Sequence, residues 1–187
     1  MDISGLAADT LRFLHNNIHA GGGSESVGVF MGSTLMGTGA NEVGVFVGNI
    51  VDKGTGTQSF GFFESCSNTA RARPDRAVNS NFFPVGDGTV LASHVSDSGC
   101  MRSNITTLDT LHQTAPYDRS IVFSGTSYTA NPAFLMDGFH VPNTSPVRNR
   151  ADETYGYWNA ISRGQLEDID GQSRPIFTPD IGVDEAE

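Results

Sequence analysis

From residue 24 onward the chain alternates apolar with small or polar residues at a period of two, and this pattern sets the fold class. Segment 27–31 carries valine or methionine at every second position, and segment 43–47 carries valine in the same way. Successive side chains of a β-strand point to opposite faces of a sheet, so each segment is predicted to be a strand. The two contain VGVF tetrapeptides, at 27–30 and 43–46, that form either two sides of a hairpin or successive strands.

More short strands are expected further along the chain. They are separated by clusters of Gly, Pro, Asn and Asp, which favour turns. Short strands at regular spacing indicate an all-β sandwich or barrel, and we assign residues 24–150 to a β-barrel domain of the jelly-roll type. The further expected strands are 60–63, 81–85, 89–95, 104–108, 119–124, 126–130 and 133–141.

The segment before this domain is predicted to be helical. Leucine, phenylalanine and isoleucine recur in residues 3–19 at spacings near three to four, which is the period of an amphipathic helix. Gly21, Gly22 and Gly23 then end the helix and supply a flexible connection. We therefore assign residues 1–23 to an N-terminal helix with a glycine hinge, which is either an arm or a surface helix packed on the domain.

Charge is the most unusual part of the composition. The chain has one lysine, Lys53, against ten arginines and 21 acidic residues, and its formal net charge is −10. This suits concentrated salt, where a Debye length of about 3 Å at 1 M screens self-repulsion. The alternative is an acidic protein in which codon bias replaces lysine by arginine. Either way, the charge argues against binding to nucleic acid or to an anionic membrane surface.

The negative charge is concentrated at the end of the chain. Residues 151–187 carry nine acidic and two basic residues and are predicted to form an extended acidic C-terminal arm with a frayed end. Near its start lie three aromatic residues, Tyr155, Tyr157 and Trp158. We expect them to anchor the arm, either on the chain's own core or on a neighbouring subunit.

No pattern of catalytic residues stands out. The tripeptide Asp97-Ser98-Gly99 follows an apolar strand as in aspartic proteases, but it is common by chance and is better explained as a β-turn. His15 and His19 have a spacing that suits a metal, but without a third ligand they are better explained as an exposed pair. We therefore expect no enzyme activity, no catalytic, cofactor or metal site, and no small-molecule substrate. Neither a membrane-spanning segment nor a signal peptide is expected.

The candidate contact residues are basic and aromatic. Arg71, Arg73 and Arg76 form a cluster that could pair with carboxylates of a neighbouring copy or of the same chain. Together with the aromatic residues of the arm, they are our candidate inter-subunit contacts. Cys66 and Cys100 either pair or remain buried free thiols. Asn104 and Asn143 begin glycosylation sequons whose use the sequence does not decide.

An acidic, lysine-poor β-protein with arms and no reactive centre has the character of a structural building block. In length, acidity, lysine depletion and strand density, the whole chain resembles the smaller major capsid protein of haloarchaeal icosahedral viruses with an internal membrane, the vertical single β-barrel group. No signature motif carries this resemblance, so no residue role is transferred from it.

The resemblance implies a virion protein that assembles with copies of itself and with a second, larger capsid protein around an internal membrane. The first alternative is a decoration, cement or tail protein of a tailed virus, which predicts the same composition. The second is a carbohydrate-binding β-sandwich in which Tyr155, Tyr157 and Trp158 form a stacking platform.

Overall fold

The described part of the chain consists mostly of β-strands, which confirms the all-β class. The protein is represented by a computed structural model, and the strands are short, with three to eight residues in most of them. The structure describes residues 2–4, 12–32, 39–42, 45–54, 56–67, 70–74, 76–78, 81–83, 89–96, 100–114, 117, 127–151, 167–174, 179–182 and 185–186.

The chain winds through four sheets in turn and then returns to the first. The largest sheet has the order β1-β4-β8-β13-β14, and its neighbours are parallel except for the last pair. Its strands are β1 (Asp2–Ser4), β4 (Glu25–Gly32), β8 (Gln58–Glu64), β13 (Thr89–Val95) and β14 (Arg102–Ile105).

Three smaller sheets complete each turn, and two of them are wholly parallel. The fourth sheet of the protein contains one parallel and one antiparallel pair. The second sheet contains β2 (Arg12–Leu14), β6 (Val45–Val47) and β11 (Arg76–Val78); the third, β3 (Asn17–His19), β7 (Ile50–Asp52) and β12 (Asn81–Phe83); the fourth, β5 (Gly39–Glu42), β10 (Ala70–Arg73) and β9 (Cys66–Ser67).

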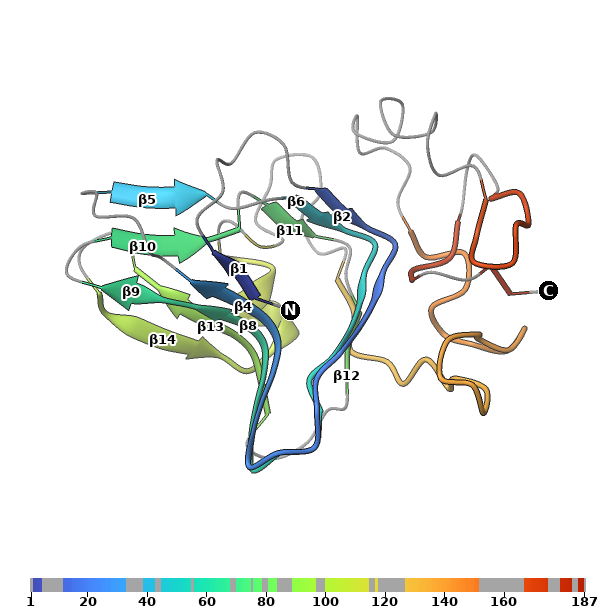
Figure 1. Ribbon diagram of the computed structural model, residues 1–187, viewed down its shortest axis with the longest axis horizontal. Helices are drawn as coiled ribbons and strands as arrows, with labels where there is room; N and C mark the ends of the chain where they lie inside the picture. Colours follow the sequence, from blue (N-terminus) through green and yellow to red (C-terminus); the bar gives the residue numbers. More distant parts are fainter. Residues whose placement is uncertain are drawn as a thin grey trace.

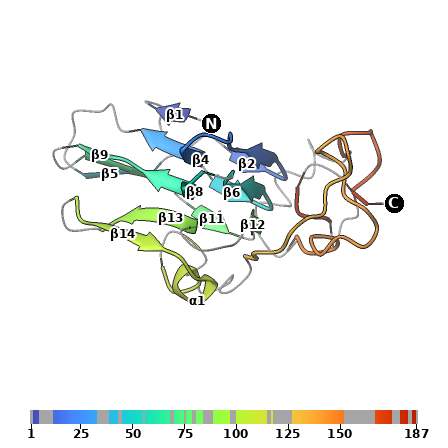
Figure 2. The same cartoon turned by 90° about the horizontal axis from the view of Figure 1, so that it is seen from below.

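This arrangement is a parallel β-helix. Arg12 pairs with Val45, and Asn17 with Ile50, so the first two coils are offset by 33 residues. Figure 1 looks along the stack, where corresponding strands of successive coils overlie one another, and Figure 2 shows the coils as layers from the side. Antiparallel β14 and the one-turn helix α1 (Leu108–Leu111) close the last layer.

Two expectations about the fold are therefore wrong for the described residues. A jelly roll is built from antiparallel strands, whereas eight of the ten described pairings are parallel. The predicted N-terminal helix is replaced, where it is described, by strands of the first coil. The division of the chain at residues 23 and 150 stays a prediction.

Equivalent side chains of neighbouring coils stack on one another. Phe13 lies on Phe46 with ring centroids 4.6 Å apart and an interplanar angle of 12°. At the next corner, the fully buried Asn49 accepts hydrogen bonds from the backbone and side-chain amides of Asn16, at 2.9 and 3.1 Å, and donates to the Phe13 carbonyl at 2.8 Å. These contacts satisfy buried polar groups and hold the two coils in register.

The C-terminal residues pack against one side of the β-helix, as both views show (Figures 1 and 2). Ile181 and Val147 share an apolar cluster with Ile50. The amide of Gly182 donates to the carbonyl of Gly48 at 2.8 Å. A Cβ on Gly182 would lie 2.6 Å from Ile50 Cδ1, and its φ of +108° also favours glycine.

The acidic end of the chain is thus folded back where it is described. Asp180 is buried, as is Glu185, whose carboxylate binds the buried Arg174 at 2.6 Å. The expectation of a frayed end is wrong for Glu185 and Ala186, because Ala186 donates to the Asp180 carboxylate at 2.8 Å. The carboxylates of this segment serve internal hydrogen bonds as well as solvation.

Candidate functional site

A buried polar cluster lies at the end of the largest sheet. Its centre is Glu64, the last residue of β8, whose side chain is fully buried. The carboxylate accepts hydrogen bonds from the Val95 amide at 2.8 Å, the Tyr117 hydroxyl at 2.7 Å and Nδ1 of His94 at 3.0 Å. A buried carboxylate requires such donors because desolvation otherwise penalises its charge.

Further polar contacts lie beside this carboxylate. Arg102 lies over the Phe63 ring, 4.2 Å from its centroid, and donates to Ser93 Oγ at 2.7 Å. Ser93 in turn donates to Asn104 at 3.1 Å, so the polar groups link β13 to the closing strand β14. The network therefore joins the last coil to its cap.

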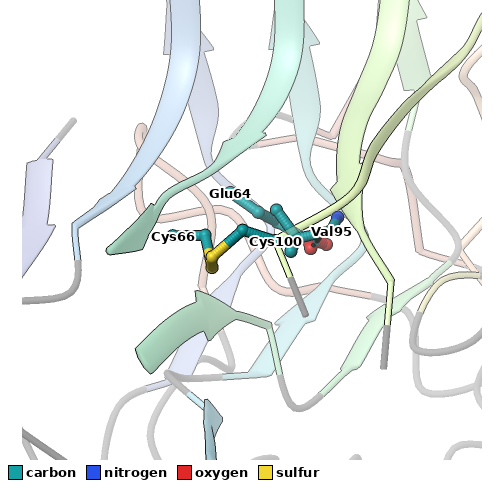
Figure 3. The surroundings of a disulfide bond; sticks show 4 residues. All are labelled: Glu64, Cys66, Val95 and Cys100. Carbon is teal, nitrogen blue, oxygen red and sulfur yellow. Dashed lines mark hydrogen bonds between the residues drawn. A yellow bond between two sulfur atoms is a disulfide. The ribbon is translucent and has the colours of Figure 1, made fainter. Parts of the chain in front are cut away.

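A disulfide lies directly beside this cluster. Cys66 and Cys100 are bonded, with Cα atoms 5.7 Å apart, which decides between the two alternatives left open by the sequence. Figure 3 shows Glu64 next to the disulfide, with its carboxylate toward the backbone nitrogen of Val95. The disulfide thus joins the chain just after Glu64 to the chain a few residues after Val95, whose amide binds the buried carboxylate.

The chemistry that this cluster can perform is limited by its enclosure. Glu64 orients the imidazole of His94, as a carboxylate does in many acid–base dyads. A third group, a nucleophile, would be needed next to this dyad. The nearby hydroxyl of Ser93 does not serve as one, because it is fully buried and hydrogen-bonded to Arg102 and Asn104. We interpret the cluster as a structural closure of the coil stack.

The histidines near the N-terminus do not form the exposed pair expected from the sequence. His15 is buried, and Nδ1 donates to the Asp180 carbonyl at 3.1 Å. Burial, together with the charge of Arg174, lowers the pKa of His15 to about 3. His19 is exposed and bonds to Asp52 at 3.2 Å, so the two rings serve different contacts. Within the described residues no group of three His, Cys, Asp or Glu side chains is arranged so that it could hold a metal ion.

The candidate contact residues are only partly placed. Arg71 and Arg73 lie in β10, in register with Ala40 and Glu42, whereas Arg76 lies in β11 of another sheet. The structure therefore divides the cluster between two strands. Tyr155, Tyr157 and Trp158 lie outside the described residues, as does Asp97-Ser98-Gly99.

The single lysine is not a surface residue. Lys53 follows β7 and is fully buried, and its Nζ has no hydrogen-bond partner among the residues that the structure describes. Burial lowers the pKa of Lys53 to about 8, against an opposing effect of Asp52. The sequence gives no sign of this, because a lone lysine is normally expected on the surface.

Replacing Lys53 with methionine should therefore stabilise the protein. At pH 7 the substitution removes a desolvated charge while keeping an unbranched side chain, and we expect the free energy of unfolding to rise by about 1–3 kcal/mol. A base with a lowered pKa binds fewer protons when folded, so the stability of the unaltered protein rises with pH from about 8 toward 10.5. Urea unfolding at pH 7 and pH 10 should show the advantage of Lys53→Met shrinking. A destabilised variant at both values would contradict the assignment.

Comparisons with protein-family models, with curated proteins and with solved structures found no match to this chain. Among the described residues, no helix is long and apolar enough to cross a membrane. The class defined here is thus a small, capped parallel β-helix with a disulfide and a side-packed C-terminal segment.

Proposed function

We propose that this protein is a structural component of a virion from a salt-rich source, and that it serves as a decoration or tail protein. The proposal keeps the virion role and takes the first alternative within it. The single jelly-roll form of a major capsid protein depends on antiparallel strands, whereas the described coils are parallel. Copies of the same chain and a second, larger virion protein are the expected partners.

The stack of parallel coils is the observation that carries this choice. Each coil bonds through its backbone to the next, so a β-helix is stiff along the stack and presents long side faces for contacts. A closing strand and helix end the stack on one side. Such a module suits attachment to an existing particle surface.

The disulfide gives independent support. Disulfides persist in oxidising surroundings and are rare in the reducing cytosol of most cells. Cys66–Cys100 links the third coil to the cap, at a place where its loss would open the stack. An extracellular particle provides the surroundings in which this bond remains intact.

Immunogold electron microscopy of particles from the native source tests the proposal. Antibodies against the purified protein should label protrusions or tails of particles. A decoration protein can be removed from a shell that stays closed, so loss of the shell together with the protein would favour the major-capsid role. Label only on cell surfaces, with binding in a glycan array, would favour the carbohydrate-binding alternative. Either result would overturn the decoration or tail assignment.

Salt dependence tests the assembly part of the proposal. Lowering salt from about 1 M to about 0.1 M lengthens the Debye length from about 3 to 10 Å, so repulsion between copies of charge −10 increases. We expect assemblies present at high salt to dissociate, as measured by sedimentation velocity. Assemblies of constant size over this range would remove the argument from charge.

A further inference from the structure

Four large apolar side chains are exposed on two turns of the C-terminal segment. Three belong to the first turn, where Leu135 is 49% exposed, Met136 fully exposed and Phe139 48% exposed. The fourth, Ile169, is 50% exposed on the second turn. We call these four residues the apolar knob.

Hydrogen bonds make each turn a defined structure. In the first, the Leu135 amide donates to the His140 carbonyl at 2.9 Å, and Gly138 donates to Leu135 at 3.0 Å. In the second, the Asp168 amide donates to the Gln172 carbonyl at 2.9 Å, and an antiparallel bridge joins Glu167 to Ser173. The apolar side chains are therefore presented on ordered backbone.

His140 joins the two turns. Its Nδ1 lies 2.5 Å from the Asp137 carboxylate, and its Nε2 lies 2.9 Å from that of Asp170. The backbone amide of Phe139, together with the His140 side chain, lowers the pKa of Asp137 to about 2. The apolar knob is thus bordered by a carboxylate that stays ionised and is held in place, and pre-ordered contact residues lose little entropy on binding.

This gathering of apolar surface is unusual in a chain of this composition. Single exposed hydrophobic residues are normal on a protein surface, whereas gathered ones mark interaction sites. Here three lie within one turn, and His140 holds the turn that carries the fourth next to it. Methionine and phenylalanine are also enriched at the centres of protein interfaces. The other large hydrophobic residues exposed in the described part, Phe30 and Met101, lie elsewhere, in β4 and beside Cys100.

Charge decides among the surfaces that the apolar knob can meet. Its border carries the acidic side chains of Glu167, Asp137 and Asp170. An anionic membrane would repel this border, and a second copy docked through the same knob would place an identical acidic border against it. We propose that the apolar knob docks into an apolar hollow with an arginine- or lysine-bearing rim on a different protein. This proposal does not depend on the virion role.

Peptide selection on the purified protein tests the charge and the place of this contact together. A random peptide library displayed on phage should yield binders that combine aromatic or aliphatic residues with arginine or lysine. A fluorescent synthetic copy of the strongest binder should lose at least tenfold in affinity for Met136→Asp. Met101→Asp is the matched control, because Met101 is also exposed but lies beside the disulfide, and it should bind as the unaltered protein does.

Several outcomes would overturn the proposal. They are a selection without enrichment, binders without basic residues, and binders indifferent to Met136→Asp. Sedimentation that shows a dimer abolished by Met136→Asp would identify a second copy as the occupant. Co-sedimentation with phosphatidylcholine vesicles that is lost in the same variant would identify a lipid surface. Circular dichroism and urea unfolding should show that both variants, altered at exposed positions, remain folded.

Discussion

Reduction of the Cys66–Cys100 disulfide should lower the free energy of unfolding by about 4 kcal/mol. The bond closes a loop across a sequence separation of 34 residues, and the chain-entropy relation gives this value for a loop of that size. The effect should be large for this fold in particular, because the bond holds the cap against the third coil beside the buried Glu64. Urea unfolding with and without a phosphine reductant measures it.

The matched control is the double variant Cys66→Ser/Cys100→Ser. It should show the reduced stability in both buffers, since it has no disulfide left to reduce. If the unaltered protein keeps its unfolding midpoint after complete reduction, confirmed by mass spectrometry of alkylated thiols, the cap is held by the Glu64 network alone and the prediction is wrong.

The second large effect is the change that His15 causes in the free energy of unfolding at acidic pH. Its pKa is about 3 in the folded protein and 6.5 in an unfolded chain, so the unfolded state binds more protons between these values. The stabilising contribution of neutral His15 is present above pH 6.5 and is lost as the pH falls toward 3. The loss should reach about 3 kcal/mol by pH 4.

Glu185 acts in the opposite direction. Burial raises its pKa to about 7, although Arg174 opposes the shift. The folded state therefore binds more protons than the unfolded state between pH 4.5 and 7, and this contribution to stability is lost as the pH rises through 7. The two trends should nearly cancel between pH 4.5 and 6.5, which leaves the intact protein with a flat stability profile there.

Single variants should separate the two trends. His15→Gln should become more stable as the pH falls from 7 to 5, whereas Glu185→Gln should lose stability more steeply than the unaltered protein. Urea unfolding at pH 7, 6 and 5 compares the three proteins, and groups common to all of them drop out of the differences. Three parallel profiles would show that neither side chain is buried in its described state.

The alternation of apolar residues predicted several strands correctly. β4, β8 and β13 follow from segments 27–31, 60–63 and 89–95, because alternation depends only on which sides of a strand are covered. It cannot distinguish parallel from antiparallel neighbours. The strands themselves are therefore predicted correctly, whereas their jelly-roll arrangement is wrong. The same ambiguity applies to the two VGVF tetrapeptides: the first lies in β4, and the described part of the second, Val45 and Phe46, lies in β6 of another sheet.

The first coil was mistaken for a helix for a specific reason. Leu14 and Ile18 are four residues apart, which is a helical spacing, but they belong to β2 and β3, on either side of a corner at which His15 has a φ of +51°. A corner between two short strands can thus imitate a helical period. Conversely, the expected strand at 133–141 is wrong, because the residues there form turns.

A comparison of the sequence with itself at an offset of 33 would have revealed the coils. Phenylalanine, asparagine, glycine and serine recur at this interval in the first two coils. Each of these residues has the same position in both coils, in a stack of side chains, at a corner or in a turn. The matching pairs are Phe13 and Phe46, Asn16 and Asn49, Gly21 and Gly54, Ser26 and Ser59, and Phe30 and Phe63. The buried state of Lys53 and the apolar knob have no such signature, because both depend on how loops pack after the coils have formed.

The side-chain stacks between coils also restrict how this protein can change its length. Phe13 on Phe46 and Asn16 on Asn49 match only when neighbouring coils keep their offset. Removing one residue between β6 and β7 would misalign one of these two contacts, since the phenylalanine lies in β6 and the asparagine at the following corner. Coils can therefore change length only where no such stack is disturbed, and the next pair of coils, in which Arg76 pairs with Val45 and Asn81 with Ile50, does have an offset of 31 residues. Gain or loss of a complete coil, about 31 to 33 residues long, is the change expected to disturb the stacks least.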